Sequence, residues 1–437
     1  MADFCVLGTG MAGYGAAYGL TQAGRKVTLF DKRDHYGGHT ASYKHAGGTI
    51  TFDEGPHVSF TKDERVKKIL ADAIDSKHEV FSTKVNNYWR GHWIKHPAQT
   101  NLYGLPAELV VKIITDFVAA QQAQPPAIEN YEQWLRASFG NTFAETFPME
   151  YTIKYHTTAA ANLNTEWIGP RLYRAKLEEV LKGALSPATA DVHYIEGFRY
   201  PTHGGFVSYL RPFMDAADVR LDHELVSIDP KKKLLGFKNG NSAEYAGVVS
   251  SIPLPELIPM IVGAPKEVVD AAALLTCSEL VLINLVVNRS DLVDAHWSYF
   301  YDRDICFARL STPHLQSRHN VPPGCGSLQA ECYYSKKYRP RDVTPESCIE
   351  PVIADLKKCG VLREGDEILF KEAQLIEYAN VIFDLDCTPS LNIVHGYLDE
   401  IGVAYCGRYG DWKYIWTDES FLSGEKAALK MLERSGV

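Results

Sequence analysis

The distribution of apolar residues predicts a β-α-β unit at the start of the chain. Residues 3–7 (DFCVL) form an apolar run of strand length, and a small-residue segment with helical spacing follows and ends at Gly24. Residues 26–31 (KVTLFD) predict a second strand. A strand, a helix and a strand in this order indicate a buried parallel sheet. Residues 37–60 predict a loop, a hairpin and a second loop.

Further along, the spacing of the apolar positions changes. Apolar residues three and four apart predict helices at 106–122 and 173–185, within a mainly helical region. Strand-like runs follow residue 217, and LVLINLVV at 280–287 is the most apolar of them. An amphipathic helix is expected at the C-terminal end. Because no repeat, low-complexity run or linker separates these patterns, we expect the domains to interleave.

Length, composition and charge narrow the class of protein. The chain has 437 residues, 46% apolar and 23% charged, which is typical of a globular protein of two or three domains. Its net charge of −9 argues against nucleic acid or an anionic membrane surface as partner. Nine cysteines occur singly without a CxxC pair, so we expect no metal site and a reduced, cytoplasmic protein. No apolar run is long enough to predict a membrane span.

A glycine motif lies directly between the first predicted strand and helix. Gly8, Gly10 and Gly13 form GxGxxG, in which the glycines permit a tight turn, close approach to a pyrophosphate and close helix–strand packing. The free N–H groups at the start of the helix would then face the phosphates. Asp31 ends the second predicted strand, and we expect it to accept hydrogen bonds from ribose hydroxyls.

The motif itself does not separate NAD from FAD. Its place at the start of the chain favours FAD, as does the glycine pair Gly37 and Gly38, which follows Asp31 closely and could bring a second backbone segment to the phosphates.

Several segments, in one order over nearly the whole chain, resemble the UDP-galactopyranose mutases and their flavoprotein relatives. The eukaryotic branch is the more similar. The segments GTGMAGYGAAYGL and DKRDHYGGH resemble the N-terminal FAD motif of the family, and FDEGPHVSF its flavin loop. The others are WRGHWIKHPAQTNLYGLP (uridine pocket), the K…W.G.R spacing of 154–171, GFRYPTHGG (a loop close to the flavin), CFARLS (an arginine-bearing strand) and GRYGDWKYIWTDESFLSGEKAA (the closing FAD motif).

The resemblance implies an α/β fold with a Rossmann-type FAD-binding domain, an interleaved helical cap and an antiparallel-sheet substrate domain of about six strands. The FAD-binding domain is expected to comprise residues 1–75, 196–255 and 396–437. The mainly helical cap would span 76–195, and the antiparallel-sheet domain 256–395.

The activity that the resemblance implies is the interconversion of pyranose and furanose forms of a nucleotide sugar. In the mutases, N5 of reduced flavin attacks the anomeric carbon, so the cofactor is the nucleophile. FAD is therefore the expected cofactor, NAD(P)H a candidate reductant and a nucleotide sugar the expected substrate. Arginine suits the diphosphate because its planar fork binds phosphate oxygens bidentately.

The resemblance also assigns roles to single residues. His57, Arg171 and Arg309 are the implied catalytic residues. Gln99 and Tyr414 would bind substrate. The residues implied to hold FAD, besides the glycines and the aspartate of the N-terminal unit, are Gly204, Gly205, Gly407 and Arg408.

The chain departs from the family pattern around the substrate. HPAQ at 96–99 stands where fungal mutases read YPFQ, so two aromatic residues that would stack on uracil are lost and Gln99 is retained. Asp386 stands where the family has a diphosphate-binding tyrosine, and an anion there is unfavourable. These departures fit a mutase-like relative with an altered substrate, and they also fit an alternative, an FAD-dependent oxidoreductase of the amine oxidase or protoporphyrinogen oxidase type. A third reading is a flavoprotein that binds FAD without turnover.

Overall fold

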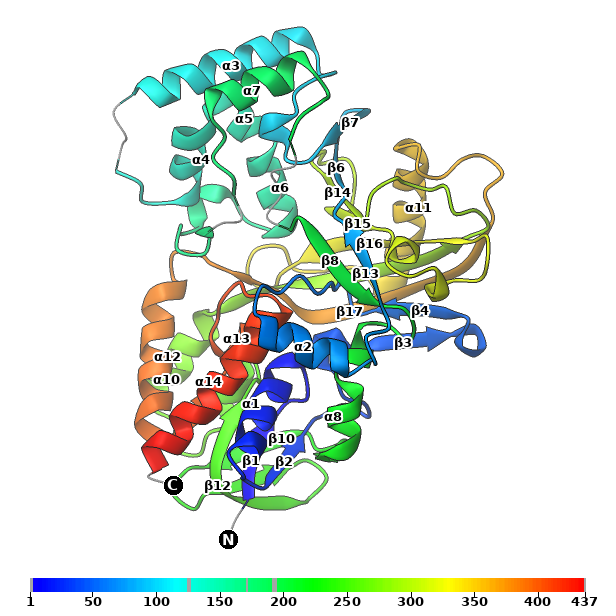
Figure 1. The fold of residues 1–437 in the computed structure, drawn as a ribbon. Helices are drawn as coiled ribbons and strands as arrows, with labels where there is room; N and C mark the ends of the chain where they lie inside the picture. Colours follow the sequence, from blue (N-terminus) through cyan, green and yellow to red (C-terminus); the bar gives the residue numbers. More distant parts are fainter. Residues whose placement is uncertain (1–2, 124–126, 170–171, 191–194, 436–437) are drawn as a thin grey trace. The chain divides into compact units, whose positions relative to one another are not determined.

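The computed structural model describes residues 3–123, 127–169, 172–190 and 195–435 (Figure 1). The chain divides into two compact units, and each is assembled from separated stretches. Unit 1 comprises Met1–Glu79, Arg199–Thr276 and Asp386–Val437, and unit 2 comprises Val80–Phe198 and Cys277–Leu385. The unit boundaries thus follow residues 79, 198, 276 and 385, where the sequence predicted domain boundaries after 75, 195, 255 and 395.

Unit 1 is built on a seven-stranded sheet whose centre is the predicted β-α-β unit. Strand β1 (Asp3–Leu7) pairs in parallel with β2 (Val27–Phe30) on one side and with β12 (Ser242–Ser250) on the other. Phe4 to Leu7 are all buried, which confirms the predicted buried parallel sheet. The other strands are β9 (Asp218–Arg220), β10 (Leu225–Asp229), β11 (Leu234–Phe237) and β18 (Ala404–Tyr405).

Helices α1 (Met11–Gln22) and α14 (Thr417–Ser435) pack side by side in unit 1 (Figure 1). Their backbones approach so closely that a Cβ atom at Gly15 would lie 1.9 Å from the carbonyl oxygen of Phe421. The remaining elements of unit 1 are the hairpin β3 (Ser42–His45) and β4 (Ile50–Asp53), as predicted, and helices α2 (Glu64–Asp72), α8 (Arg211–Ala216), α9 (Leu254–Leu257), α10 (Lys266–Leu274), α12 (Cys387–Ile401) and α13 (Gly407–Gly410).

Two of these helices account for the shifted boundaries. Helix α10 packs against α12 inside unit 1, although the sequence predicted that 256–395 would belong to the sheet domain. No helix was predicted at 387–401, where only Asp386, at its start, was interpreted as a residue near the substrate.

Unit 2 contains a second seven-stranded sheet, in the order β17-β13-β16-β15-β14-β6-β7. Most pairs are antiparallel, as predicted, but β6 pairs in parallel with β14. The sheet thus has one strand more than the six or so that were expected, and one of its pairs is parallel. The strands are β6 (Val85–Trp89), β7 (His92–Lys95), β13 (Thr276–Val287), β14 (Trp297–Phe300), β15 (Arg309–Ser311), β16 (Gly326–Tyr334) and β17 (Ile368–Ile382).

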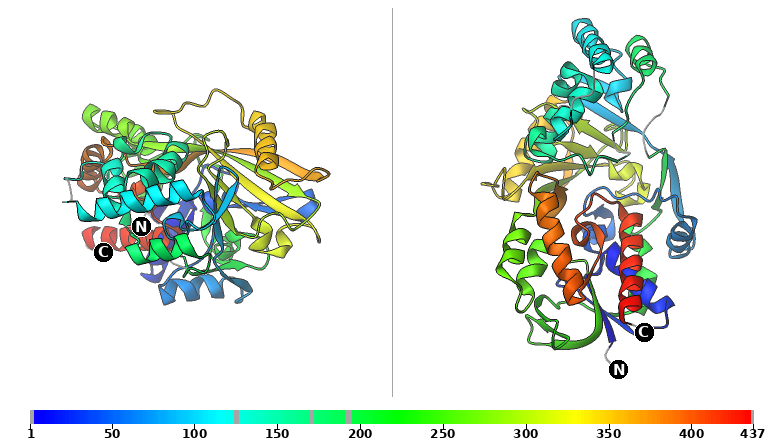
Figure 2. Two further views of the ribbon diagram at one scale, coloured as in Figure 1. Left: turned by 90° about the horizontal axis from the view of Figure 1, so that it is seen from above. Right: turned by 90° about the vertical axis from the view of Figure 1, so that its left-hand side faces the viewer.

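Strands β6 and β7 come from the segment predicted to be mainly helical. The turn between them, Arg90-Gly91, has φ angles of 46° and 83°, and such a pair of left-handed residues closes a two-residue hairpin. The helical part of the segment is otherwise as predicted, with α3 (Ala107–Gln122) and α7 (Leu177–Leu185). Between them lie α4 (Tyr131–Phe139), α5 (Asn141–Thr146) and α6 (Pro148–Tyr155), which gather with them beside β7 (Figures 1 and 2).

The two faces of the unit 2 sheet differ in character. On one face, apolar residues such as Val281, Leu310 and Leu328 form a core with helix α11 (Ile349–Lys358). Alternation of side chains along each strand places Asn284, Gln329 and Glu331 on the opposite face, together with a smaller apolar cluster that includes Leu280 and Leu282. Strands β5 (His78–Ser82) and β8 (Gly197–Pro201) form a separate two-stranded sheet. Among the described residues, no helix combines the length and the apolar character that crossing a bilayer requires.

Candidate functional site

The predicted glycine motif forms the turn between β1 and α1. Gly8 has a φ of +102°, a conformation that favours glycine, and a Cβ atom at Gly13 would lie 1.9 Å from the carbonyl oxygen of Gly8. Gly10 is the N-cap of α1, so no side chain of its own covers the first N–H groups of the helix. These groups and the helix dipole make the turn a suitable place for a phosphate.

A second glycine loop lies against this turn. The Gly37 N–H group donates a hydrogen bond of 3.1 Å to the carbonyl oxygen of Thr9. A Cβ atom at Gly38 would lie 3.0 Å from the Cα atom of Gly10. The structure thus brings Gly10, Gly37 and Gly38 together in a cradle made of backbone.

Asp31 directly follows β2, and its carboxylate is hydrogen-bonded to the glycine turn. Its Oδ2 atom accepts hydrogen bonds from the Thr9 N–H group at 2.9 Å and the Thr9 hydroxyl at 2.6 Å. Its Oδ1 atom accepts from the Arg33 N–H group at 3.0 Å. The carboxylate therefore has a structural role in the cradle besides any contact with a ligand.

A buried carboxylate, Glu54, gathers basic and hydroxyl groups beside the second glycine loop. It accepts hydrogen bonds from Arg33 at 2.7 and 3.2 Å and from Tyr43 at 2.5 Å, and it contacts His39 Nδ1 at 2.7 Å. Burial alone would raise the pKa of Glu54, but His39 and Arg33 hold that pKa well below its usual range. Arg33 also donates to the carbonyl oxygen of Gly38 at 3.2 Å, so the ion pair fixes the loop.

The segment GFRYPTHGG forms β8 and a tight turn that is anchored to Asp53 on β4. Asp53 accepts hydrogen bonds from Ser42 at 2.6 Å, Tyr200 at 2.6 Å and the Phe206 N–H group at 3.0 Å. Gly205 has a φ of +77°, and a Cβ atom there would lie 2.3 Å from Ser42 Oγ. Gly204 also has a positive φ, and a Cβ atom on it would meet Ser208 Oγ at 2.6 Å.

His57 is neutral and oriented by its own loop. Its Nδ1 atom lies 2.9 Å from the carbonyl oxygen of Gly55, so Nδ1 carries the proton and Nε2 is left as an acceptor. Burial lowers the pKa of His57 to about 4, with the positive charges of His39 and Arg408 adding to the effect. The ring also packs against Phe206, at 5.6 Å between centroids.

The closing motif packs onto the start of α1. Gly407 has a φ of +76°, and a Cβ atom there would lie 2.6 Å from Ala12 Cβ. Arg408 donates two hydrogen bonds to the carbonyl oxygen of Ile415, at 3.2 and 2.7 Å, and its guanidinium lies 5.5 Å from the ring centre of Tyr414. Unit 1 thus holds all the predicted cofactor-binding residues, together with His57 and Tyr414.

In unit 2, Arg309 lies on the polar face of the sheet and forms a bidentate ion pair with Glu331. Both N–H···O distances are 2.7 Å, from Nε and Nη2 of Arg309, and Glu331 is fully buried. Tyr333 donates a further hydrogen bond of 2.6 Å to the same carboxylate. Burial alone would lower the pKa of Arg309, but the charge of Glu331 raises that pKa well above its usual value.

Aromatic residues surround this ion pair. Tyr299 is the cross-strand partner of Arg309 on β14. Tyr151 and Tyr155 of α6 stack at 5.4 Å, and Tyr155 lies 4.8 Å from Tyr333. Burial raises the pKa of Tyr151 well above its usual value, so its hydroxyl stays protonated. The arrangement is a polar, aromatic patch on the sheet face opposite the apolar core.

The remaining residues that were predicted to contact the substrate have the following positions in the structure. Gln99 donates a hydrogen bond of 2.9 Å to the carbonyl oxygen of Tyr173 in unit 2. Arg171 lies outside the described residues. Asp386, which stands where the mutases have a tyrosine, is the N-cap of α12 in unit 1.

The sequence did not predict several residues whose hydrogen bonds and ion pairs hold the glycine loops and Arg309 in position. Arg33, Glu54 and Asp53 lie inside quoted motifs, but only their neighbours were assigned roles. The acidic pair in FDEGP was a signal that could have found two of them. Glu331 had no such signal, because it stands alone in a buried strand, GSLQAECYY.

Comparison with known proteins agrees with this architecture. The NAD(P)-binding Rossmann-like domain family matches residues 6–73. No curated protein sequence matches the chain. The structure of reduced UDP-galactopyranose mutase superposes with a TM-score of 0.93 at 24% identity, covering 100% of this chain and 95% of that one.

Two amine oxidases have the fold as well. Cyclohexylamine oxidase from Brevibacterium oxydans gives a TM-score of 0.69 at 12% identity, with 100% of both chains covered. Putrescine oxidase bound to putrescine gives 0.66 at 15% identity, with 99% of both covered. The predicted resemblance to the mutases and their relatives is therefore confirmed at the level of the fold.

Proposed function

We propose that unit 1 binds FAD and that the protein interconverts pyranose and furanose forms of a nucleotide sugar. The observation that carries the proposal is the likeness to reduced UDP-galactopyranose mutase, with a TM-score of 0.93 over the whole chain. The amine oxidases, with TM-scores of 0.66 and 0.69, are less similar in fold.

The backbone cradle in unit 1 fits a dinucleotide such as FAD. The turn at Gly8 and Gly10 and the start of α1 would hold the pyrophosphate, because N–H groups and the helix dipole favour negative charge there. Gly37 and Gly38 add a second backbone wall that a Cβ atom would fill. Asp31 stands at the end of β2, where ribose hydroxyls are bound in such folds. Bound and reduced, FAD would supply the nucleophile for the anomeric carbon.

The residues of this chain would then position groups and hold charge. His57, neutral at pH 7, offers Nε2 as a proton acceptor in a buried place. Arg309 and Arg171 are proposed to hold the diphosphate, and Gln99 and Tyr414 other parts of the nucleotide sugar. Stabilising charge in a site that excludes water is the main contribution that such residues make.

The test uses the purified full-length protein. Its absorption spectrum first establishes whether FAD is bound. The protein is then reduced with dithionite and incubated with UDP-galactopyranose and a panel of other nucleotide sugars, and the products are separated by chromatography. We expect a furanose product with reduced protein and none with oxidised protein. FAD-loaded, reduced protein that converts no member of the panel would contradict the mutase proposal.

A second function is favoured by the ion pair between Arg309 and Glu331. Because the carboxylate of Glu331 binds Nε and Nη2 of Arg309 and balances its charge, the pair is electrically neutral, and it suits an uncharged or cationic substrate better than a diphosphate. The alternative is an FAD-dependent oxidoreductase. Anaerobic bleaching of the flavin band by a small amine or alcohol would support it. Bound FAD with neither isomerisation nor bleaching would instead indicate a binding protein without turnover.

A further inference from the structure

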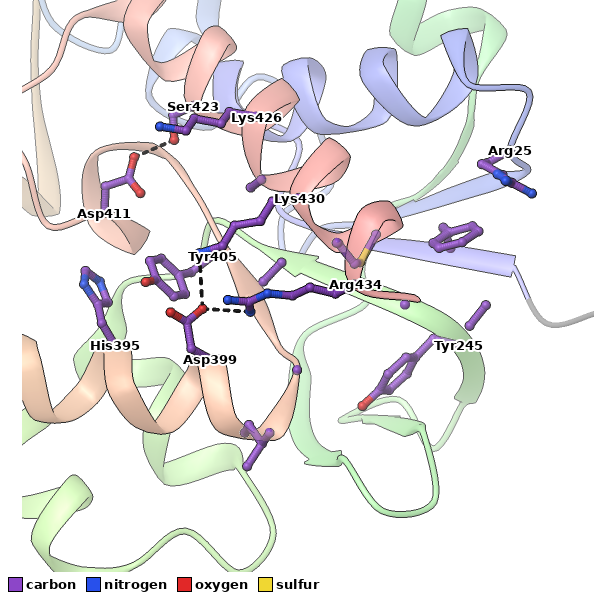
Figure 3. Close-up of a pocket in the computed structure, with 18 of the residues that line it drawn as sticks. Arg25, Tyr245, His395, Asp399, Tyr405, Asp411, Ser423, Lys426, Lys430 and Arg434 are labelled. Carbon is purple, nitrogen blue, oxygen red and sulfur yellow. Dashed lines mark hydrogen bonds and ion pairs between the residues drawn. The ribbon is translucent and has the colours of Figure 1, made fainter. Parts of the chain in front are cut away.

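A large groove lies in unit 1 between helices α12 and α14 (Figure 3). Its volume is about 1220 Å³, above the range of about 300–1,000 Å³ that is usual for small-molecule sites. None of the predicted cofactor or substrate residues lines it. Part of the segment that resembles the closing FAD motif, including Asp411, Lys413 and Ser423, lines the groove, but a docking role there does not depend on the proposed mutase activity.

One continuous face of α14 lines the groove. Eight residues from Glu419 to Arg434 contribute, at positions i, i+3, i+4 and i+7 and onward in the same pattern. At a rise of 1.5 Å per residue this face is about 22 Å long. The opposite wall is formed by α12 through Leu391, His395 and Asp399, which are each one turn apart. Within the part of the chain that the structure describes, the groove thus runs along this face of α14, with α12 as its other wall.

The groove is cationic although the protein is anionic. Seven lysines and arginines line it against three acidic residues, in a chain whose net charge is −9. Lys430 and Arg434 share one partner, Asp399, at 3.5 and 2.9 Å. Lys413 and Lys426 are exposed, and both interact electrostatically with Asp411 in the same groove. A surplus of positive charge on one surface attracts a negatively charged partner.

The floor of the groove is apolar. Phe4, Tyr245 and Met431 are buried there, and Leu422 and Ala427 are half-buried. His395 and Tyr405 stack face to face at 4.1 Å between ring centroids, next to Asp399 (Figure 3). An occupant that matches this surface must carry apolar groups along one side and negative charges along the flanks.

We propose that this groove is a docking site for an acidic amphipathic helix of a partner protein. A helix laid between two helices inserts apolar residues at i, i+3, i+4 and i+7. Lys426, Lys430 and Arg434 follow each other by four residues, so carboxylates one turn apart on the partner can meet them in register. Asp399 holds two of these cations in the wall. A small polyanion would use the cations of the rim but make no use of the apolar groups between them.

The test measures binding of a designed probe to the full-length protein. The probe is a fluorescent peptide of about 16 residues, the length of the groove at 1.5 Å per residue, with leucines in the helical pattern and glutamates elsewhere. A scrambled peptide of the same composition is the control. We expect saturable binding of the probe at low ionic strength, weaker binding as salt is added, and no saturable binding of the scrambled peptide. A photoreactive probe should cross-link to α12 and α14.

Charge reversal locates the binding surface. Lys426→Glu with Lys430→Glu should weaken binding at least about tenfold, which corresponds to about 1.4 kcal/mol. The matched control, Lys67→Glu with Lys68→Glu on α2 of the same unit, should leave it unchanged. Lys68, Lys426 and Lys430 are exposed and Lys67 is half-buried, and thermal melting checks that both variants fold. Equal binding of both variants, equal binding of the scrambled peptide, or full displacement by tripolyphosphate alone would overturn the proposal.

Discussion

The Tyr200 hydroxyl donates a hydrogen bond of 2.6 Å to Asp53, although the two residues are 147 positions apart in the chain. Both are buried in unit 1. The bond ties β8 and the turn at Gly204 and Gly205 to the β3–β4 hairpin. Because Asp53 also accepts from the Phe206 N–H group just after that turn, one carboxylate holds both ends of the turn in place.

Replacing Tyr200 by phenylalanine should destabilise the protein measurably. The substitution leaves a buried carboxylate with one donor fewer, which costs about 1.5–3 kcal/mol for a hydrogen bond to a charged group. Chemical denaturation of Tyr200→Phe measures the change in the free energy of unfolding. Tyr103→Phe is the control, because Tyr103 is 53% exposed and its change should be within about 0.5 kcal/mol. Equal costs for the two would contradict the anchoring role.

Asp53 should make the protein less stable as the pH rises from about 4 to about 6. Burial raises the pKa of Asp53 to about 6, although its three hydrogen bonds oppose the shift. The folded protein then binds a proton that the unfolded chain has lost, so the stabilisation is complete below pH 4 and is lost as the pH rises through 6. The contribution is about 3 kcal/mol.

The measurement is the free energy of unfolding of wild type and Asp53→Asn between pH 4 and 7. The asparagine does not titrate, so the difference between the two proteins isolates Asp53 from other groups. A difference that is flat over this range, or that grows in the opposite sense, would show that Asp53 is already ionised at pH 4.

Alanine at Gly205 should cost more than alanine at a glycine with the same backbone requirement. Gly205 and Gly240 have φ angles of +77° and +84°, but only at Gly205 would the new methyl group meet other atoms, at 2.3 Å from Ser42 Oγ. Gly240→Ala should cost about 1–2 kcal/mol for its backbone conformation. Gly205→Ala should add about 1–3 kcal/mol for the steric conflict. Similar melting temperatures for the two variants would contradict this close packing.

Alanine substitutions at two glycines of the first motif should have different effects, one on cofactor binding alone and the other on stability as well. A Cβ atom at Gly10 would make only an ordinary contact, 3.6 Å from the carbonyl oxygen of Gly37, in a backbone conformation open to any residue. Gly10→Ala should therefore fold normally, yet lose most of its FAD, because the methyl group occupies the approach to the pyrophosphate. Gly13→Ala should lose stability as well, since its methyl group would lie 1.9 Å from Gly8.

The checks for these variants are the flavin absorbance per protein after gel filtration and the melting temperature of the FAD-free protein. Wild-type FAD content in Gly10→Ala would remove the turn from the proposed cofactor site.

The ion pair between Arg309 and Glu331 should be strongly coupled. Arg309→Met leaves the buried carboxylate of Glu331 without its charge partner and should cost about 3–5 kcal/mol. Adding Glu331→Gln should recover most of that loss, because no charge then remains unpaired. A double-mutant cycle by urea denaturation measures the coupling. Additive effects of the two substitutions would mean that the pair contributes nothing beyond its separate residues.

Much of unit 1 was predictable because its signals are local. The strand, turn and helix from Asp3 to Gln22 follow from an apolar run, glycines with special backbone angles and a helical spacing of small residues. The hairpin of β3 and β4 follows in the same way from a short stretch. The glycine loop at 37–38 was also identified by its place after Asp31.

The parts of the fold that depend on pairing between distant segments could not be predicted from local sequence signals. Strand β6 joins the sheet by parallel pairing with β14, which brings Val85 beside Trp297 across 212 residues of chain. In unit 1, the packing of α12 against α10 likewise joins segments that lie far apart in the chain. Neither the pairing partner of a strand nor the packing partner of a helix can be predicted from a short window of residues.

By itself, the sequence determined the Rossmann-like start, the helical segment and the glycine turns, because strand alternation, helical period and glycine geometry depend on neighbouring residues. Only the tertiary structure decided that Glu331 occupies the fork of Arg309 and that Asp53 holds the turn after Tyr200. It also decided that cations of α14 line an apolar groove beside α12. These relationships depend on the register of strands and on helix packing across distant segments, and they determine which charges are neutralised and which stay available to a ligand.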